Sequence, residues 1–539
     1  MIACLIAAFS LQPADLVIEN ARIWTDGRTY FASTLAVRDG AFVHVGDADP
    51  SLIGPETKRV DVGGALVVPG LFDSHIHMLN GGMQLSRLNL RDATDKEDFV
   101  AKVRDWAAKL GPGEWILGGR WSTESWSTPE LPHRAWIDAA SGGRPAWLSR
   151  MDGHSGLANS EALRRAGITR EGPADPPGGV IDRDPQTGEP TGILRETAMG
   201  LVARLVPAES ADDRLAALKR AIDYASEHGI TSVSDVTSMA DLPIYERLAQ
   251  EGPAKVRLHL YPTSDDWTAA AQAANRFQGL PGFIEIKGFK AYMDGSLGSR
   301  TAYMRAPFLG NPPDRPDWRG LPMPGVLEGL MERNVRAADQ AGYQAIVHAI
   351  GDEGNHLLLN IVQSATRDPR QARARSEHAQ HLLPEDIERF ARLGVIASMQ
   401  PYHKADDGRY AEDYIGKERC HSSYAFKSLL DVGAVVAFGS DWPVVTLNPF
   451  LGLEAAVTGR ILSGVIWEPQ ENIPLAEALR CYTSAAAYAV KRESDLGRIA
   501  PGYQADFIVL NQDLFVPPVK WDKVKPTAVY VAGRRVLGM

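Results

Sequence analysis

The chain has 539 residues, 44% of them hydrophobic and 23% charged, which is the composition of a globular protein with a sizeable core. Its formal net charge of -10 leaves no basic surface to attract nucleic acid or anionic lipid, so neither is an expected partner. The three cysteines lie far apart without Cys-x-x-Cys spacing, which excludes a disulfide framework and a zinc ribbon. This length suits a (β/α)8 barrel of about 250 residues with insertions and a small companion domain.

Residues 1–14 form an apolar N-terminal stretch that includes Leu5, Ile6 and Phe9. It has the length of a signal-peptide core and is too short to span a bilayer. No Lys or Arg precedes it, and a small-residue cleavage pattern is poorly formed. Two interpretations stay open: a signal segment of a periplasmic or secreted protein, or an N-terminal extension of a cytoplasmic one.

Strand-like segments occur at both ends of the chain. Residues 15–25 and 35–46 carry alternating or continuous apolar residues bounded by Gly and Asp, as antiparallel strands do. Residues 505–510 and 528–537 follow the same pattern, with Gly533 at a turn. We therefore predict one small β-sandwich domain built from residues 15–65 and 496–539.

Between these ends, residues 66–495 alternate short apolar strands with helical patterns, which is typical of βαβ units. The sequence predicts eight such strands, near residues 66–77, 229–236, 255–262, 284–293, 343–349, 375–379, 394–400 and 434–440. Eight parallel strands favour a closed (β/α)8 barrel of the TIM type, so the predicted fold class is α/β.

Residues 80–210 break this alternation and are predicted to be a large insertion after the first barrel strand. They contain six of the twelve tryptophans and several Pro and Gly clusters. Loops after barrel strands lie on the active-site face, which favours a lid or substrate wall, with Trp121 as a residue of the wall. The alternative is a separate subdomain in which Trp121 belongs to an aromatic core.

Several residues that can bind a metal stand where predicted strands end. His75 and His77 lie two apart, so their imidazoles share one face of a strand. His348 and His378 end two later strands, and Asp441 follows the eighth. Because catalytic residues of such barrels gather at the carboxyl ends of the strands, we expect these five side chains to converge on a metal site.

The fourth strand offers two lysines, Lys287 and Lys290, on opposite faces. Lys290 is nearer the carboxyl end and shares a face with Asp294, which favours it as the residue of the site. A buried ammonium among metal ligands would be costly, so Lys290 is expected to be deprotonated or chemically modified.

The chain resembles the amidohydrolase superfamily, specifically its amidohydrolase 3 group of YtcJ-like proteins and N-substituted formamide deformylases. The resemblance runs from about Asp15 to Val536. It is carried by Val68–His77, Asp152–His154, Lys290–Arg300, His348–Asp352, Glu377–Gln380 and Gly439–Pro443.

This resemblance implies two divalent metal ions, one held by His75, His77 and Asp441 and the other by His348 and His378. Lys290 would bridge them as its carbamate. The ligand set favours zinc, with manganese, iron, cobalt and nickel as alternatives. The resemblance also implies that His154 and Asp294 line the substrate site, although each could equally hold a loop by hydrogen bonding.

The implied reaction is hydrolysis of a C–N bond in a small amide, such as an N-acyl or N-formyl amine, by hydroxide that the metals activate. Asp441 would shuttle the proton. A deaminase, an esterase or lactamase on the same barrel, and a catalytically silent binding protein remain alternatives. Gly351 stands where related deaminases carry a glutamate, and no ligand position is lost. The expected partner is the amide substrate, and homodimerisation is left open.

Overall fold

The computed structural model describes residues 12–26, 31–123, 126–128, 130–150, 155–280, 282–311, 313 and 315–538. The chain divides into two compact units. The first contains the chain up to Met78 and from Ala221 onward, and the second contains Leu79–Arg220. The predicted insertion, 80–210, falls within the second unit.

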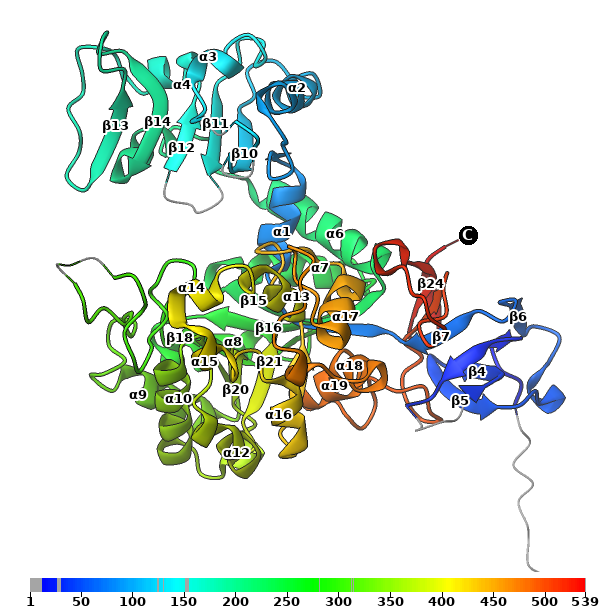
Figure 1. Cartoon of the computed structure of the whole chain (residues 1–539). Coiled ribbons are helices and arrows are strands. Elements are labelled where there is room, and N and C mark those ends of the chain that lie inside the picture. The colour runs from blue at the N-terminus through cyan, green and yellow to red at the C-terminus, as the bar shows by residue number, and fades with distance from the viewer. Residues whose placement is uncertain are drawn as a thin grey trace, which may run out of the picture. The chain divides into compact units, whose positions relative to one another are not determined.

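A nearly closed parallel sheet forms the centre of the first unit (Figure 1). Its strand order is β22-β21-β20-β19-β18-β16-β15-β8, with β17 beside β16. Backbone hydrogen bonds from Asp441 N to His75 O, 2.7 Å, and from His77 N to Trp442 O, 2.9 Å, link its last and first strands. The strands are β8 (Leu71–Ile76), β15 (Ile230–Ser238), β16 (Arg257–Thr263), β17 (Ile284–Ile286), β18 (Gly288–Tyr292), β19 (Gln344–Ala349), β20 (Arg375–His378), β21 (Ile396–Met399) and β22 (Val436–Phe438). The predicted barrel is confirmed, and each predicted strand region contains a barrel strand.

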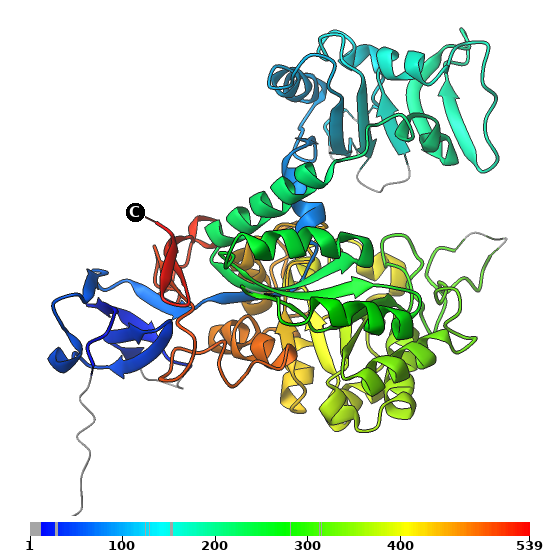
Figure 2. The same cartoon turned by 180° about the vertical axis from the view of Figure 1, so that it is seen from behind.

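Helices cover the outside of this sheet, as the view from behind also shows (Figure 2). They bury one apolar face each: Leu358, Leu359 and Val362 of one helix, for example, are at most 1% exposed. The helices of this unit are α7 (Leu242–Gln250), α8 (Trp267–Ala274), α9 (Leu330–Ala341), α10 (Asp352–Ala365), α11 (Pro369–Ala372), α12 (Pro384–Leu393), α13 (Pro401–Asp407), α14 (Ala411–Ile415), α15 (Lys417–Cys420), α16 (Phe426–Asp431), α17 (Pro449–Thr458), α18 (Leu475–Cys481) and α19 (Ser484–Ala489). Helix α6 (Ala211–Glu227) runs through the boundary between the two units.

The first predicted strand, 66–77, is two strands rather than one. It divides at Gly70 into β7 (Leu66–Pro69) and β8, and β7 joins a different sheet, between β2 and β23. A side chain at position 70 would lie 2.2 Å from Thr231 Oγ1, so glycine allows the close approach that the division requires. The Gly70 amide donates to Asp506 O at 2.9 Å, outside the barrel ladder.

Two small sheets from the two ends of the chain complete the first unit. One has the order β5-β4-β1-β6 and the other β25-β24-β23-β7-β2-β3. Their shared core contains Ile23, Phe42, Val67, Phe507 and Tyr530, which confirms the small sandwich predicted from both termini. The strands are β1 (Leu16–Glu19), β2 (Arg22–Trp24), β3 (Phe31–Ala32), β4 (Thr34–Arg38), β5 (Ala41–Gly46), β6 (Lys58–Asp61), β23 (Phe507–Leu510), β24 (Pro526–Val531) and β25 (Arg534–Leu537).

The second unit has a six-stranded sheet of its own, in the order β13-β14-β12-β11-β10-β9. Phe99, Trp121 and Trp126 belong to one of its hydrophobic clusters, and Trp115 and Trp147 to another. Its elements are α1 (Met78–Leu85), β9 (Leu88–Asn89), α2 (Lys96–Ala107), β10 (Ile116–Trp121), α3 (Arg134–Ile137), β11 (Ala146–Arg150), β12 (Ser155–Ala158), α4 (Ser160–Arg165), β13 (Gly179–Arg183), β14 (Pro190–Glu196) and α5 (Gly200–Ala203).

Across the part of the chain that the structure describes, no helix is both long and apolar enough to pass through a membrane. The apolar N-terminal stretch, residues 1–14, lies outside the described residues as far as position 11.

One buried histidine of the barrel, His259 on β16, has no hydrogen-bond partner in the described structure for either ring nitrogen. Its ring stacks on Phe72 with centroids 5.3 Å apart and is 1% exposed. Burial holds the pKa of His259 well below its usual value, so the folded chain does not bind the proton that the unfolded chain takes up below about pH 6.5. His259 therefore costs stability as the pH falls.

We expect His259→Leu, which is close to histidine in volume, to raise the free energy of unfolding. The gain over the parent chain should grow by about 1 kcal/mol between pH 7.5 and pH 5.5. Urea unfolding at the two pH values measures it, with the exposed His421→Leu as control. An equal gain in unfolding free energy at both pH values would contradict the conclusion that His259 stays neutral in the folded chain.

Candidate metal centre

The carboxyl ends of the barrel strands surround a cavity of about 400 Å³. Its lining includes every metal-binding residue expected from the sequence: His75, His77, Lys290, His348, His378 and Asp441. They come from the end of β8 and the turn after it, from β18, β19 and β20, and from the turn after β22. The barrel thus brings together side chains that are up to 366 residues apart in sequence.

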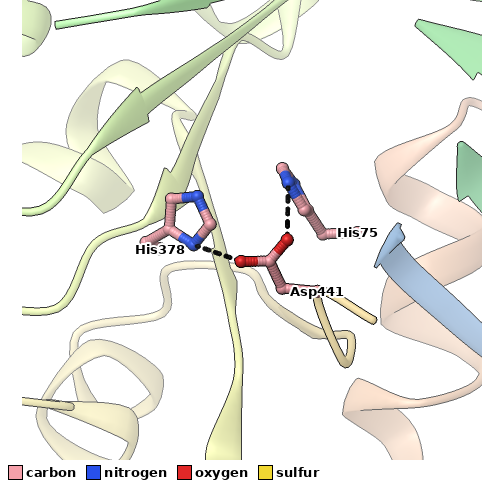
Figure 3. A group of neighbouring side chains, drawn as sticks. All are labelled: His75, His378 and Asp441. Atoms are coloured by element: carbon pink, nitrogen blue, oxygen red, sulfur yellow. Dashed lines mark ion pairs between the residues drawn. The ribbon is translucent and has the colours of Figure 1, made fainter. Parts of the chain in front are cut away.

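Three of these residues form a compact group (Figure 3). His75, His378 and Asp441 each offer a ligand atom, and these atoms lie within 4.8 Å of one another. The Asp441 carboxylate stands between the two rings, with Oδ1 3.7 Å from His75 Nε2 and Oδ2 4.0 Å from His378 Nδ1. All three side chains are buried, and Asp441 Oδ1 has no hydrogen-bond partner in the described structure.

The other three expected ligands adjoin this group. His77 Nε2 lies 3.2 Å from Asp441 Oδ1, and Lys290 Nζ lies 3.4 Å from His75 Nε2. The rings of His348 and His378 have centroids 4.5 Å apart. Lys287, the alternative lysine, does not line the cavity and pairs instead with Glu285 at 2.5 Å.

Hydrogen bonds to one nitrogen of each ring decide which nitrogen can bind a metal. His348 Nε2 donates to Gly295 O at 2.9 Å, which leaves the lone pair on Nδ1. His378 Nδ1 donates to Gln400 Oε1 at 2.8 Å, which leaves Nε2. A second contact, from Gln400 Nε2 to Ser398 O at 3.4 Å, supports this orientation of the amide. Such partners for the non-ligating nitrogen are usual in metal-binding histidines.

His75 is held by a buried chain of charges. Its Nδ1 donates to Glu377 Oε2, which leaves the lone pair on Nε2, the atom that faces Lys290 and Asp441. Glu377 in turn accepts from Arg375 Nε at 2.7 Å, and neither side chain of this ion pair is exposed. Burial alone would raise the pKa of Glu377, but Arg375 and His75 hold it at about 2. Glu377 is therefore ionised throughout the neutral range.

Burial also determines the protonation of the expected ligands. It lowers the pKa of His75 to about 4 and that of His348 to about 3, with the Lys290 charge acting in the same direction. It lowers the pKa of Lys290 to about 8, against the charges of Glu377 and Asp441. Burial would raise the pKa of Asp441, but the contacts with His77, His75 and His378 hold it well below its usual value. Neutral imidazoles and an ionised carboxylate are the forms that bind metal.

The backbone is strained at two of these residues. Asp441 has φ 56° and His378 has φ 77°, a left-handed conformation that non-glycine residues seldom adopt. Such strain persists only where the surrounding structure compensates for it, and it is concentrated at functional sites. It aims both side chains into the cavity, since both line it.

The three residues expected to line the substrate site differ in placement. Asp294 is fully buried, and its carboxylate accepts from the backbone amides of Tyr303, Ile350 and Gly351 at 2.8 to 3.0 Å. It therefore holds the loops around His348, as in the alternative left open by the sequence. Trp121 is 1% exposed in the core of the second unit, where its Nε1 donates to Leu148 O. His154 lies outside the described residues.

The structure adds residues that the sequence did not single out. Tyr292, Gln380, His403 and Tyr410 line the cavity, and Glu377 orients His75 from behind it. Gln380 belongs to the Glu377–Gln380 motif, which was a usable signal. His403 stands in the first turn of α13, beyond the end of β21, where no strand periodicity places it.

The donor set suits a metal ion. It offers lone pairs on neutral imidazoles, an ionised carboxylate with an oxygen lacking a hydrogen-bond partner, and a lysine whose pKa is lowered, all around one cavity. Together with a (β/α)8 barrel, this site is typical of metal-dependent enzymes that act on small molecules at the mouth of the barrel.

Comparison with known proteins gives the family. A model of the amidohydrolase family matches residues 58–537, and the chain belongs to this family. It is 37% identical to Protein LONG AFTER FAR-RED 3 of Arabidopsis thaliana, over 97% of this chain and 91% of that protein. It is 33% identical to the putative amidohydrolase YtcJ of Bacillus subtilis (86% and 87%), and 26% identical to N-substituted formamide deformylase of Arthrobacter pascens (93% and 94%).

The solved structures agree with this placement. The chain resembles an uncharacterized metal-dependent hydrolase from Pyrococcus horikoshii OT3 with a TM-score of 0.76 and 26% identity. The match covers 94% of this chain and 99% of that one. The resemblance to this solved structure therefore extends over nearly the whole chain, including the barrel.

We predict that Glu377 both stabilises the fold and orients His75. Glu377→Gln leaves Arg375 buried without its counter-charge, which should lower the free energy of unfolding by about 3 to 5 kcal/mol. It also loosens the hold on His75, so metal affinity should fall by ~10- to 100-fold. Denaturant unfolding and metal titration measure the two effects.

The double variant Arg375→Met/Glu377→Gln separates the effect on stability from the effect on metal affinity. Because it removes both charges, it should recover stability without recovering metal affinity. The partly exposed pair of Arg373 and Glu493 supplies the control, and Glu493→Gln should cost less than about 1 kcal/mol. Metal affinity that recovers together with stability would show that Glu377 does not act through His75.

Proposed function

We propose that this chain hydrolyses a C–N bond of a small N-acyl or N-formyl amine, with two divalent metal ions held by the residues of the cavity. The observation that carries the proposal is the convergence of His75, His378 and Asp441 with Lys290 in one buried site. The N-substituted formamide deformylase, similar over nearly the whole chain, supports an amide as substrate.

Under this proposal His75, His77 and Asp441 would hold one ion, and His348 and His378 would hold the other. When bound, the ions lower the pKa of a water molecule toward ~7 and polarise the scissile carbonyl. Zinc is the metal that imidazole and carboxylate ligands favour.

Lys290, as its carbamate, would supply oxygen ligands to both ions in this proposal. Burial and the lowered pKa of Lys290 increase the share of neutral amine at neutral pH. The neutral Nζ attacks CO2 and forms a new N–C bond while one C–O π pair moves onto oxygen. One proton passes from the nitrogen to water, which leaves an anionic carbamate. This change replaces a cation that metal ions would repel with an oxygen ligand.

Asp441 moves the proton of the reaction. Its carboxylate is ionised and buried beside the histidine rings, so it can accept a proton from the attacking water. As the C–N bond breaks, Asp441 returns this proton to the leaving nitrogen. The products are a carboxylic acid and a free amine, and the acid then gives its proton to the amine.

Substrate specificity is expected to depend on the other residues that line the cavity. Leu297, Ile350 and Val445 supply apolar surface, and Tyr292 and Tyr410 supply rings. Such a lining favours an amide with a small acyl group and an apolar or aromatic amine.

The test is turnover of a panel of N-formyl and N-acyl amines, lactams, esters and amino-purines by metal-loaded protein. We expect amine release from amides. Asp441→Asn keeps an oxygen for the metal but cannot take a proton, so it should retain much of its metal while losing activity by ~10² to 10⁴. Asp386→Asn, a buried carboxylate that does not line the cavity, is the matched control.

Two outcomes contradict the proposal. Release of ammonia from amino-purines, with no amide turned over, would make the chain a deaminase. Turnover of an amide by Asp441→Asn within a factor of a few of the parent rate, at equal metal content, would place the base elsewhere.

A further inference from the structure

His403 has no assigned part in the metal centre, yet it lines the same cavity. It is 8% exposed and stands in the first turn of α13, after the seventh barrel strand, β21. Its ring is parallel to that of His378, with centroids 6.2 Å apart and 9° between the planes. The ring therefore lies beside the expected ligands, outside the group of His75, His378 and Asp441.

Gln380 decides which nitrogen of His403 carries the proton. Gln380 Nε2 lies 3.3 Å from His403 Nδ1 in an amide orientation that leaves Gln380 Oε1 without a hydrogen-bond partner in the described structure. In this orientation the amide nitrogen can only donate. The Nδ1 atom therefore accepts, and the neutral ring carries its proton on Nε2.

That Nε2–H group is buried and has no hydrogen-bond partner in the described structure. The Asp441 Oδ2 atom is 3.8 Å away, beyond hydrogen-bond distance. A buried donor without an acceptor costs free energy, and such groups persist where a ligand completes them. His403 thus presents an N–H donor without an acceptor near the Asp441 carboxylate, where the proposed reaction takes place.

We propose that His403 is a catalytic residue that donates a hydrogen bond from Nε2 to the substrate's carbonyl oxygen, and that Gln380 is the positioning residue that keeps the proton on Nε2. This inference rests on the proposed function. As the hydroxide oxygen bonds to the carbonyl carbon, the π pair moves onto the carbonyl oxygen, which becomes an oxyanion. The His403 proton stays on Nε2 and stabilises that charge. The C=O bond re-forms as the C–N bond breaks, and Asp441 supplies the proton to the leaving nitrogen.

The distances support this division of work. His75 Nε2 and His403 Nε2 lie 3.7 and 3.8 Å from different oxygens of the Asp441 carboxylate. A carbonyl carbon attacked next to Asp441 can therefore direct its oxygen toward His403. The competing role, a further metal ligand, would require the lone pair on Nε2 and hence a proton on Nδ1, which would face the Gln380 amide donor.

Four variants test the proposal. His403→Phe keeps a ring and removes the donor, whereas His403→Gln retains an N–H donor that can reach the former position of Nε2. Gln380→Met removes the amide that selects the tautomer. His421→Gln is the matched control, because His421 is 58% exposed and does not line the cavity. Each protein is loaded with zinc and assayed for metal content, kcat and KM on the best amide, and the Kd of methylphosphonate, a mimic of the tetrahedral oxyanion.

We expect all four variants to keep the parent metal content. His403→Phe should lose ~10² in kcat with little change in KM, because the donor acts mainly on the charge that develops in the transition state. It should also bind methylphosphonate at least tenfold more weakly. His403→Gln should regain part of both losses, and Gln380→Met should show a smaller fall in kcat. Partial rescue by Gln is a result that a purely structural role would not produce.

Loss of metal from His403→Phe, with the fold intact, would overturn the proposal in favour of a metal ligand. Parent values of kcat and methylphosphonate affinity in His403→Phe would overturn it outright. If the parent protein cleaves no amide but His403→Phe still loses methylphosphonate affinity at full metal content, the proposed function fails and the assignment of His403 stands.

Discussion

Arg375 and Glu377 form an ion pair with no exposed surface in the interior of the barrel. Arg375 also donates to Ser74 O, to Ser234 Oγ at 3.1 Å and to Ser398 Oγ at 3.0 Å, so it joins four barrel strands, β8, β15, β20 and β21. Burying two charges is costly, and the pair is tolerated because its hydrogen-bonding groups find these partners. Since Glu377 holds His75, the ion pair that joins the strands also orients the first ligand of the metal centre.

A second constraint follows from burial at the mouth of the barrel. Asp441 Oδ1 and His403 Nε2 are buried without hydrogen-bond partners in the described structure, and Asp441 and His378 have left-handed backbones. Each of these features costs free energy unless a bound group compensates for it. A metal ion and a substrate carbonyl would satisfy the unused groups, so binding offsets a cost already present in the fold.

Much of the fold and the candidate site could be predicted from the sequence because each expected ligand ends an apolar run. Parallel strands bring such ends to one edge, which is why His348, His378 and Asp441 meet although the sequence separates them. Strand alternation distinguished Lys290 from Lys287, and the structure buries the first in the cavity while the second pairs with Glu285. Local periodicity was sufficient for these features.

The remaining features depend on contacts that periodicity does not encode. The division of 66–77 at Gly70 follows from its approach to Thr231, 161 residues later. Trp121 packs in the core of the second unit because β10 pairs with β11. No sequence motif predicts this pairing. His403 meets Gln380 only because the elements after β20 and β21 lie side by side.

The central claim, a lysine-bridged pair of metal ions, is tested most directly by the metal content of purified protein and its Lys290 and Lys287 variants. We expect about two equivalents per chain in the parent and in Lys287→Ala, and clearly fewer in Lys290→Ala, with short carboxylic acids partly restoring metal and activity. Two equivalents and full activity in Lys290→Ala, with loss of metal in Lys287→Ala, would contradict the account.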